Sequence, residues 1–207
     1  MKNFGFIQTE FDGTEQIYMA PQSIEIPEEF SYMNNLPKVI DQGEDSICVP
    51  CSIAAFINWD KNLIDGIIKD NEVDLSQIFE NRSDKENYNG MTFKDALTFI
   101  KNEGVNTKDG LYKIKQYARV TSLYALKYAI FMNGPCLGGL PVYNMERDFW
   151  NKNYSDDFQG LHAVSIVGYT KDSFIIRNSW GTSYGIKGYY TLKYEDINKF
   201  VELWTII

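Results

Sequence analysis

One histidine and three cysteines are the residues of this sequence best suited to nucleophilic chemistry. A thiol becomes an acylating nucleophile when its pKa falls, when a base orients it and later returns a proton, and when hydrogen-bond donors stabilise the oxyanion. His162 is the only imidazole of the chain, and no other side-chain type has an unperturbed pKa in the same range. The sequence therefore offers one general base, which needs a thiol as its partner.

The thiol best placed to serve as the nucleophile is that of Cys48. Ser46 is a candidate N-cap, Pro50 suits the first turn of a helix, and apolar residues follow at helical spacing, so we expect a helix to start here. The dipole and the unpaired N–H groups at a helix start favour a thiolate. Cys51 would lie one turn further along, inside the helix, which makes it the weaker candidate.

Three further side chains could support this pair of residues. Asn178 follows His162 in the next strand-to-loop segment, where a hairpin would bring its carbonyl oxygen to the ring and fix the tautomer. Trp180 could cover that hydrogen bond and exclude water. Gln42, shortly before Cys48, could donate a side-chain N–H to an oxyanion, together with the backbone N–H of Cys48.

Cys48 and Cys51 also form a Cys-x-x-Cys motif, which suggests redox chemistry or half of a zinc site. A redox enzyme of that type would need a thioredoxin-like βαβ pattern around the motif, and the sequence lacks one. A zinc site would need two more ligands, which one histidine and the distant Cys136 supply poorly. We therefore expect neither a metal nor another cofactor, and we assign Cys136 to core packing. A merely structural Cys48 is the remaining alternative.

The elements that must position these residues change in type along the chain. Helices are expected in three segments, which are the segment from Ser46 onward, 92–103 and 122–132. Strands are expected in four later segments, which are 161–169, 174–176, 188–192 and 203–207. Helices first and strands second indicate an α+β fold with a seam between its halves, and seams are where sites form.

Three separated segments resemble the papain-like, cathepsin-like cysteine peptidases and occur in the order typical of that family. Residues 42–48 resemble the Gln-Gly-x-x-x-x-Cys segment, 161–164 the histidine strand, and 178–189 the Asn-Ser-Trp-Gly-x-x-(aromatic)-Gly-x-x-Gly-Tyr signature. The likeness runs from Pro27 to Ile207. It implies a papain-like fold, with an N-terminal helical lobe, a C-terminal antiparallel sheet or barrel lobe, and an active-site cleft between them.

The resemblance also implies roles for individual residues. The catalytic roles fall to four positions, which are Cys48 as nucleophile, His162 as base, Asn178 as orienting amide and Gln42 as oxyanion donor. The substrate-binding roles fall to Asn89, Gly90, Met91, Gly138, Gly139, Leu161 and Trp180. Within this second set, 89–91 would pair with the substrate backbone. The two adjacent glycines would form the floor of the pocket for the second residue upstream of the cut.

The sequence departs from the family pattern at several positions. Asp45 stands where the cathepsins carry a cysteine, so their conventional disulfide is missing, as in many bacterial and viral relatives. Val49 replaces an aromatic residue after the nucleophile, and Leu161 replaces the polar residue often found before the histidine. The separation of Cys48 and His162 is shorter than in papain-type enzymes, and a long inhibitory propeptide of the cathepsin kind is not expected.

Composition excludes several classes of partner. The net charge is -8 with a pI of about 4.7, and lysines and arginines are not clustered, so we expect no nucleic-acid partner. No apolar run of about 18 residues occurs, so we expect no membrane association. The N-terminus lacks the pattern of a signal peptide, and the few cysteines fit a reducing compartment. We therefore expect a cytoplasmic or virus- or phage-associated protein.

We expect three segments along the chain. Residues 1–26 form an N-terminal arm or a short prosegment, 27–120 a mainly helical lobe with the nucleophile, and 121–207 a mainly β lobe with the histidine and asparagine. In the arm, two apolar stretches flank the turn signal Asp12-Gly13, which predicts a hairpin or a loosely held extension. As a hypothesis, the arm lies across the cleft and inhibits the enzyme; an extra strand or a flexible end is the alternative.

The expected function is endopeptidase activity on peptide or protein substrates through a thioester at Cys48. Two alternatives stay open at this point. The same residues could serve an amidase or transamidase that acts on cell-wall peptides or isopeptides. A binding module could also have kept the fold without the activity.

Overall fold

The structure is a computed structural model that describes residues 4–83, 85–86 and 90–207. Its helices are α1 (Cys48–Asp65), α2 (Leu75–Glu80), α3 (Phe93–Asn102) and α4 (Leu123–Asn133), with the 3₁₀ helices η1 (Met33–Asn35) and η2 (Tyr194–Lys199). Its strands are β1 (Phe30–Ser31), β2 (Val105–Thr107), β3 (Gly110–Tyr112), β4 (Tyr117–Arg119), β5 (Cys136–Val142), β6 (Gly160–Tyr169), β7 (Ser173–Arg177), β8 (Tyr189–Lys193) and β9 (Glu202–Ile206).

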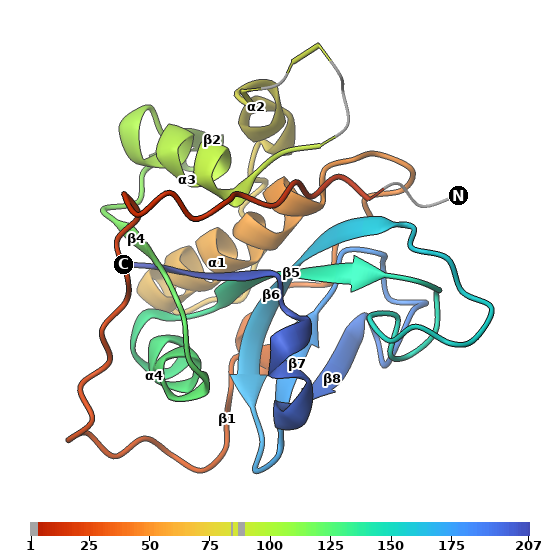
Figure 1. Ribbon diagram of the computed structural model, residues 1–207. Coiled ribbons are helices and arrows are strands. Elements are labelled where there is room, and N and C mark those ends of the chain that lie inside the picture. The colour runs from red at the N-terminus through yellow and green to blue at the C-terminus, as the bar shows by residue number, and fades with distance from the viewer. Residues whose placement is uncertain (1–3, 84, 87–89) are drawn as a thin grey trace.

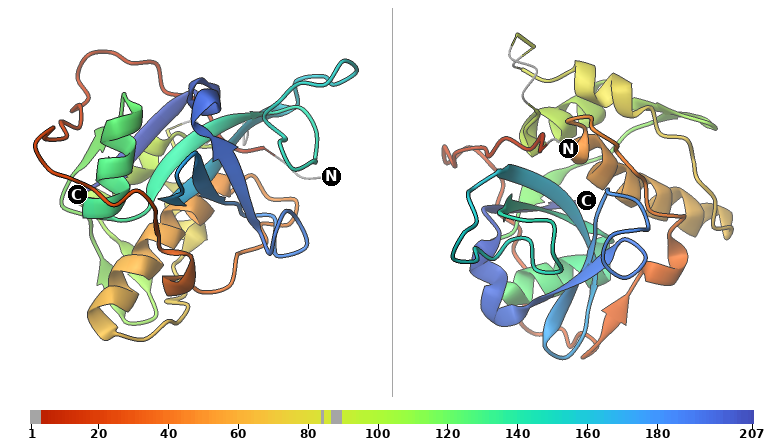
Figure 2. Two further views of the ribbon diagram at one scale, coloured as in Figure 1. Left: turned by 90° about the horizontal axis from the view of Figure 1, so that it is seen from below. Right: turned by 90° about the vertical axis from the view of Figure 1, so that its right-hand side faces the viewer.

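Among the described residues, seven strands form one antiparallel sheet, which carries the second half of the chain. Its order is β4-β9-β5-β6-β7-β8, and β1 pairs with β6. The sheet lies beside α1, α2 and α3 on one side and α4 on another (Figures 1 and 2). Three of the four described α-helices precede β2 and most of the sheet follows α4, so the α+β expectation is confirmed.

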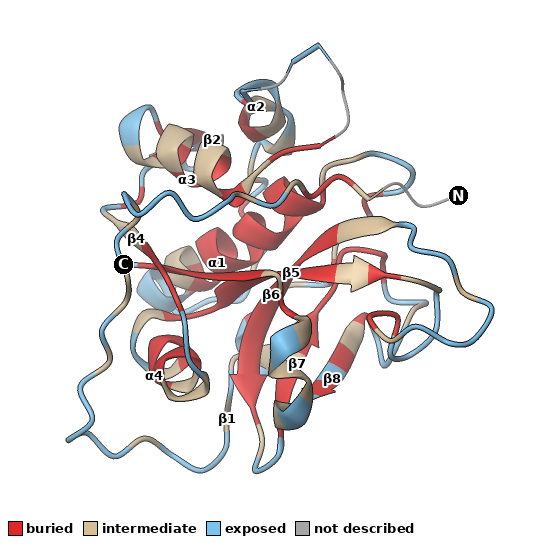
Figure 3. Cartoon of the chain, viewed as in Figure 1, coloured by how far each residue is buried: buried red, intermediate tan, exposed pale blue. Residues whose placement is uncertain are grey.

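Helix α1 is the central element of the helical half. Its first twelve residues are all buried, and it packs along β6, so this part of the helix is covered on all sides (Figure 3). The helix begins at Cys48 after Ile47 and has no side-chain cap, so the predicted capping role of Ser46 was wrong. Ser46 instead packs against the N-terminal arm, where a β-carbon on Gly5 would lie 2.0 Å from the Ser46 carbonyl oxygen.

Two other helices begin where their sequence signals place them. The side chain of Thr92 accepts a hydrogen bond from the backbone N–H of Asp95 at the start of α3. The side chain of Ser122 accepts one from Ala125 at the start of α4. Each cap satisfies an N–H group that the helix leaves unpaired, so the two helix predictions are confirmed to within a residue at each end.

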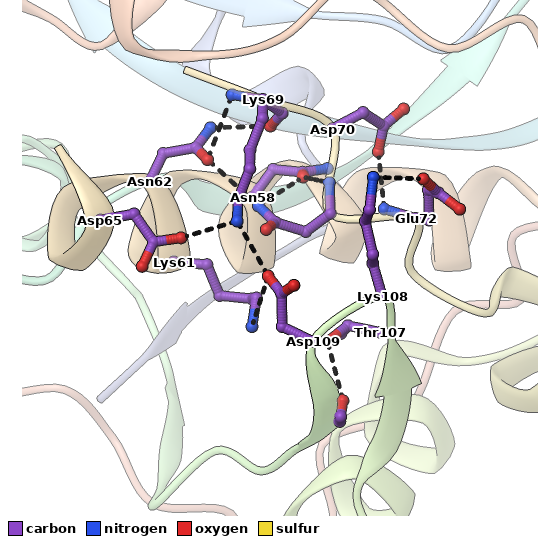
Figure 4. Close-up of polar contacts among 12 residues, drawn as sticks. Asn58, Lys61, Asn62, Asp65, Lys69, Asp70, Glu72, Thr107, Lys108 and Asp109 are labelled. Carbon is purple, nitrogen blue, oxygen red and sulfur yellow. Dashed lines mark hydrogen bonds and ion pairs between the residues drawn. The ribbon is translucent and has the colours of Figure 1, made fainter. Parts of the chain in front are cut away.

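A polar cluster fixes the loop that follows α1 (Figure 4). The Asn58 side-chain oxygen accepts from the backbone and side-chain N–H groups of Asn71 at 2.7 and 3.1 Å. The Asn62 side chain exchanges hydrogen bonds with the backbone of Lys69, whose ammonium pairs with Asp65 and Asp109 at 2.9 Å each. The loop from Gly66 to Asn71 is thereby tied to α1 and to the β2–β3 hairpin.

The N-terminal arm does not form a hairpin. It crosses the molecule as an extended chain, and its contacts include two isolated parallel bridges, Phe6 with Met91 and Ile17 with Arg119 (Figure 1). Phe6 belongs to the same buried apolar cluster as residues of α1 and α3. The arm therefore packs on both halves of the fold. The three-segment division of the chain stays a prediction. Strand β4 lies before residue 120 and pairs with β9, which lies after it.

Candidate active site

His162 and Asn178 form the polar centre of the site. His162 lies on β6 and Asn178 follows β7, which pairs with β6. The distance between His162 Nε2 and Asn178 Oδ1 is 2.7 Å, and the same oxygen accepts the backbone N–H of Ser179 at 2.7 Å. Because that oxygen only accepts, Nε2 must carry the proton. The neutral ring then presents Nδ1 as its basic atom.

Trp180 covers this hydrogen bond. Its ring centroid lies 4.7 Å from that of His162 with an interplanar angle of 31°, and the residue is fully buried. Phe149, from the segment between β5 and β6, packs on Trp180 with a centroid distance of 5.0 Å. These rings exclude water, which strengthens the bond between His162 and Asn178.

Cys48 is the first residue of α1, and its thiol faces β6. The thiol lies within hydrogen-bonding range of the backbone of Ala163, the residue after His162, and of Gly5 in the arm. Burial raises the pKa of Cys48 to about 11, and backbone hydrogen bonds, the largest from Ala163, oppose that rise. The thiol is therefore held protonated while the arm covers it.

Gln42 is tied to the Asn178 segment. Its side-chain oxygen accepts from Ser179 Oγ at 2.6 Å, its side-chain nitrogen donates to the Asp45 carbonyl at 2.7 Å, and its backbone N–H donates to the Ser179 carbonyl at 2.9 Å. The residue is 3% exposed. These bonds hold the amide at the start of α1, next to the segment that carries the asparagine and the tryptophan.

Residues 4–7 of the arm contact most of the predicted substrate-binding positions that the structure describes. The Phe6 N–H donates to the Leu161 carbonyl at 3.3 Å. The Met91 N–H donates to the Gly5 carbonyl at 2.8 Å, and the Ile7 N–H donates to the Met91 carbonyl at 3.1 Å. The arm thus makes backbone bonds to Leu161 and Met91, the positions that the sequence predicts for a substrate.

The predicted glycines have different surroundings. A β-carbon on Gly90 would lie 2.2 Å from the Gly5 carbonyl oxygen, and one on Gly139 would lie 2.1 Å from the ring of Phe6. A larger residue at either position would collide with the arm, so the arm can lie here only because both residues are glycine. The open side of Gly138 faces Phe200 on the other face of the sheet, so Gly138 does not line the cleft. Asn89 lies outside the described residues.

Sequence reasoning missed the arm residues that cover the site. The Phe4 ring lies edge-on to His162 and Trp180, with centroid distances of 6.1 and 6.0 Å. Further along the arm, the Thr9 N–H donates to the Glu202 carboxylate at 3.1 Å, and the Thr9 carbonyl accepts from Arg119 at 2.7 Å. The apolar stretch at 4–7 was the only sequence signal of this contact.

The Arg119–Glu202 pair that holds Thr9 is itself buried. Arg119 Nη2 lies 3.3 Å from the Glu202 carboxylate. Burial raises the pKa of Glu202, and the nearby guanidinium opposes the rise. Buried charges are costly unless they are paired and hydrogen-bonded, and the backbone of Thr9 supplies hydrogen bonds to both side chains. The pair therefore favours the bound position of the arm.

In the part of the chain that the structure describes, no group of three or more histidine, cysteine or acidic side chains could hold a metal ion. The helices found there are all too short or too polar to cross a bilayer. The cysteines are free thiols, which agrees with the expected absence of a disulfide.

Comparison with known proteins places these features in a family. The family model described as papain family cysteine protease matches residues 80–202, which include His162 and Asn178 but not Cys48. The cathepsin B-like CP1 of Giardia intestinalis is 27% identical over 208 residues, covering 81% of this chain and 68% of that protein. Other cathepsin B-like relatives are matched over 27% of their length, so the chain spans about a quarter of those proteins.

Solved structures show the same fold. Xylellain, a cysteine protease from Xylella fastidiosa, superposes with a TM-score of 0.85 at 23% identity, covering 99% of this chain and 96% of that chain. The proCathepsin B S9 from Trypanosoma congolense superposes with a TM-score of 0.79 at 16% identity, covering 100% of this chain and 87% of that chain. The papain-like fold expected from the sequence is confirmed.

Proposed function

We propose, on the premise that this chain belongs to the papain family of cysteine proteases, that it is an endopeptidase with Cys48 as its nucleophile. The single observation that carries the proposal is the hydrogen bond of Asn178 with His162 on strand β6, which packs along the helix that begins at Cys48. The distance from His162 Nε2 to Asn178 Oδ1 is 2.7 Å, and this bond keeps the proton on Nε2. Nδ1 is therefore the basic atom of the ring, and we assign it to the Cys48 thiol at the start of α1.

In the proposed reaction, His162 Nδ1 takes the proton of the Cys48 thiol and the resulting thiolate attacks the scissile carbonyl carbon. The position of Cys48 at the helix start stabilises the thiolate once the arm has left. The carbonyl oxygen becomes an oxyanion. The Cys48 backbone N–H and the side-chain N–H of Gln42 stabilise it, and the bonds from Gln42 to Ser179 and Asp45 keep that amide in place.

The imidazolium of His162 then protonates the leaving amine, and a thioester with Cys48 remains. Water, deprotonated by the same imidazole, attacks the thioester and releases the acid and the free thiol. Asn178 holds the ring throughout these steps, and Trp180 keeps water from the bond between them.

The arm supports a second part of the proposal, which is self-inhibition by residues 4–9. Their backbone bonds to Leu161 and Met91, together with the Phe6 ring beside Gly139, fill the positions proposed for a substrate. One protein of similar fold is the proCathepsin B S9 from Trypanosoma congolense, which agrees with a covering segment. A substrate binds only when this segment has moved away.

Profiling of a peptide library with the full chain and three alanine variants tests the peptidase proposal. We expect cleavage by the wild type, by Cys51→Ala and by Cys136→Ala, and loss of cleavage in Cys48→Ala with an unchanged melting temperature. A thiol-reactive epoxide should label the wild type at Cys48 alone. Full activity in Cys48→Ala together with loss in Cys51→Ala would overturn the assignment.

A further inference from the structure

Cys51 is the one member of the Cys-x-x-Cys motif for which the proposed reaction has no use. It follows Cys48 by one helical turn, and its backbone N–H makes the helical bond to the Ile47 carbonyl at 3.0 Å. Residues three apart in an α-helix lie on one face with their Cα atoms about 5 Å apart. That separation lies within the range that a disulfide spans. Both thiols are free in the structure.

The surroundings of Cys51 are not those of a cysteine kept for apolar packing. It is 4% exposed, yet it belongs to neither of the two buried apolar clusters. It borders a cavity of about 10 Å³ whose other walls are Ile40, Ser52, Ala163, Ser165, Arg177, Asn178 and Ser179. Most of these neighbours are polar, and the cavity lies directly beside Cys51.

The two thiols share a neighbour. Cys48 interacts with the backbone of Ala163, and Ala163 also borders the cavity beside Cys51. Burial raises the pKa of Cys51, and the nearby Cys48 sulfur raises it further. The side chains are therefore close enough to influence each other. A disulfide would require the Cys51 sulfur to turn toward that of Cys48 about the Cys51 side-chain bond.

We propose that Cys48 and Cys51 are an oxidation site, at which a hydroperoxide converts the two thiols into a reversible disulfide that masks the nucleophile. The proposal takes the identity of the nucleophile from the proposed function. The disulfide itself depends only on the placement of the two cysteines in the first turn of α1.

The chemistry balances in two steps. The Cys48 thiolate attacks the terminal oxygen of the hydroperoxide, an S–O bond forms, the O–O bond breaks, and the alcohol leaves with a proton. Cys51 then attacks the sulfenic sulfur of Cys48, an S–S bond forms, the S–O bond breaks, and water leaves with the remaining proton. Two thiols lose two electrons and two protons, and the hydroperoxide is reduced to an alcohol and water. A dithiol reverses the change.

The arm decides when this oxidation takes place. Cys48 is fully buried, and Gly5 lies directly over it while the arm is closed. A hydroperoxide reaches the thiolate only after the arm has moved, which is the state in which the enzyme would also bind a substrate. Cys51 then stops the oxidation at the disulfide, before the irreversible sulfinic and sulfonic acids form.

Mass spectrometry of the full chain tests the proposal. Reduced wild type and Phe6→Ala, whose arm is loosened, are treated with hydrogen peroxide, denatured and labelled with N-ethylmaleimide. The chain has three cysteines, so the reduced protein takes three labels and the oxidised protein is expected to take one. Trypsin releases residues 39–61 with both cysteines of the motif. After oxidation this peptide should be unlabelled and lighter by two hydrogens, and dithiothreitol should restore both labels and the peptidase activity.

Two variants separate this role from general oxidation. Cys51→Ser cannot form the disulfide, so its Cys48 should proceed to sulfinic acid and regain roughly tenfold less activity than the wild type after dithiothreitol. Cys136→Ala is the matched control, which should still lose both of its remaining labels. Three retained labels in both the wild type and Phe6→Ala, or equal recovery of Cys51→Ser and the wild type, would overturn the proposal. The label count does not depend on activity, so it also separates this proposal from the proposed peptidase function.

Discussion

The ring of Phe6 occupies the space that a side chain at residue 139 would need, because a β-carbon on Gly139 would lie 2.1 Å from Phe6 Cε1. Phe6 is 4% exposed, and its ring centroid lies 4.8 Å from that of Phe93. The closed arm therefore depends on the glycine, which leaves room for the ring. The Phe6 ring in turn covers Gly139, which we assign to the pocket for a substrate side chain.

Replacement of this ring should release the arm. Burial of a phenylalanine side chain stabilises a contact by about 1.5–3 kcal/mol, so Phe6→Ala should shift the arm toward the open state by roughly tenfold or more. The expected result is a higher initial rate on a fluorogenic peptide, measured without preincubation. The matched control is Phe11→Ala, which removes an arm ring that is 56% exposed. Equal initial rates for the two variants would argue against self-inhibition.

The sequence predicted those features that depend on local signals. The predicted bounds of α3 and α4 agree with the observed ones to within a residue, because the Thr92 and Ser122 hydroxyls that cap these helices act within one helical turn. The Asn178 motif predicted the oxygen beside His162, because the turn between β6 and β7 is short enough to fix how the two strands pair.

The features that sequence reasoning missed depend on contacts between distant segments. The bond from Phe6 to Leu161 joins residues that are far apart in the sequence, and no local pattern encodes it. The different surroundings of Gly138 and Gly139 could not be predicted for a related reason. Adjacent residues of a strand point to opposite faces, and only the packed structure shows that Phe200 lies on one face and Phe6 on the other.

The bond between Gln42 and Ser179 predicts that these residues act as one unit. Gln42→Ala removes an oxyanion donor and should lower kcat by about a hundredfold. Ser179→Ala removes the hydroxyl that holds the amide at 2.6 Å and should lower kcat by about tenfold. The double variant should be no worse than Gln42→Ala, because the hydroxyl acts only through the amide.

The control for this cycle is Ser183→Ala, an exposed serine in the same loop, which should leave kcat unchanged. Steady-state kinetics on one peptide substrate measures all four variants. Additive losses in the double variant would show that Ser179 does not act through Gln42.

The bond between His162 and Asn178 predicts a loss of rate without a loss of binding. Asn178→Ala leaves Nε2 without its acceptor, so the ring can adopt the wrong tautomer, and kcat should fall by about a hundredfold while KM changes little. Asn178→Asp keeps an acceptor and adds a negative charge, which favours the imidazolium and raises the pKa of His162. Its pH–rate profile should therefore rise at higher pH than that of the wild type. An unshifted profile with wild-type kcat would contradict the orienting role.

The Asn58–Asn71 contact predicts a loss of stability that spares the site. Asn58→Ala removes the acceptor of the buried backbone N–H of Asn71, while the Asn71 side-chain amide keeps its bond to Asn62, and the free energy of unfolding should fall by about 1–3 kcal/mol. Urea unfolding measures this change, with the exposed Asn198→Ala as control. The kcat of the folded variant should equal that of the wild type, because the bonds of this cluster join α1, the loop 66–71 and the β2–β3 hairpin (Figure 4).

The burial of Cys48 predicts that alkaline pH opens the arm. Burial raises the pKa of this thiol from 9.0 to about 11, so the closed state holds the proton more tightly than an open state in which the thiol meets water. The closed state is therefore fully favoured below the ordinary thiol pKa, and its advantage is lost as the pH rises from 9.0 toward about 11. The test measures the rate at which iodoacetamide alkylates Cys48, read from the mass of the peptide 39–61. Both proteins carry Cys51→Ser, and one of them also carries Phe6→Ala. The alkylation rate should rise at lower pH in the protein with Phe6→Ala than in the one without it. The two profiles should converge at high pH, and coincident profiles throughout would show that the arm does not control the thiol.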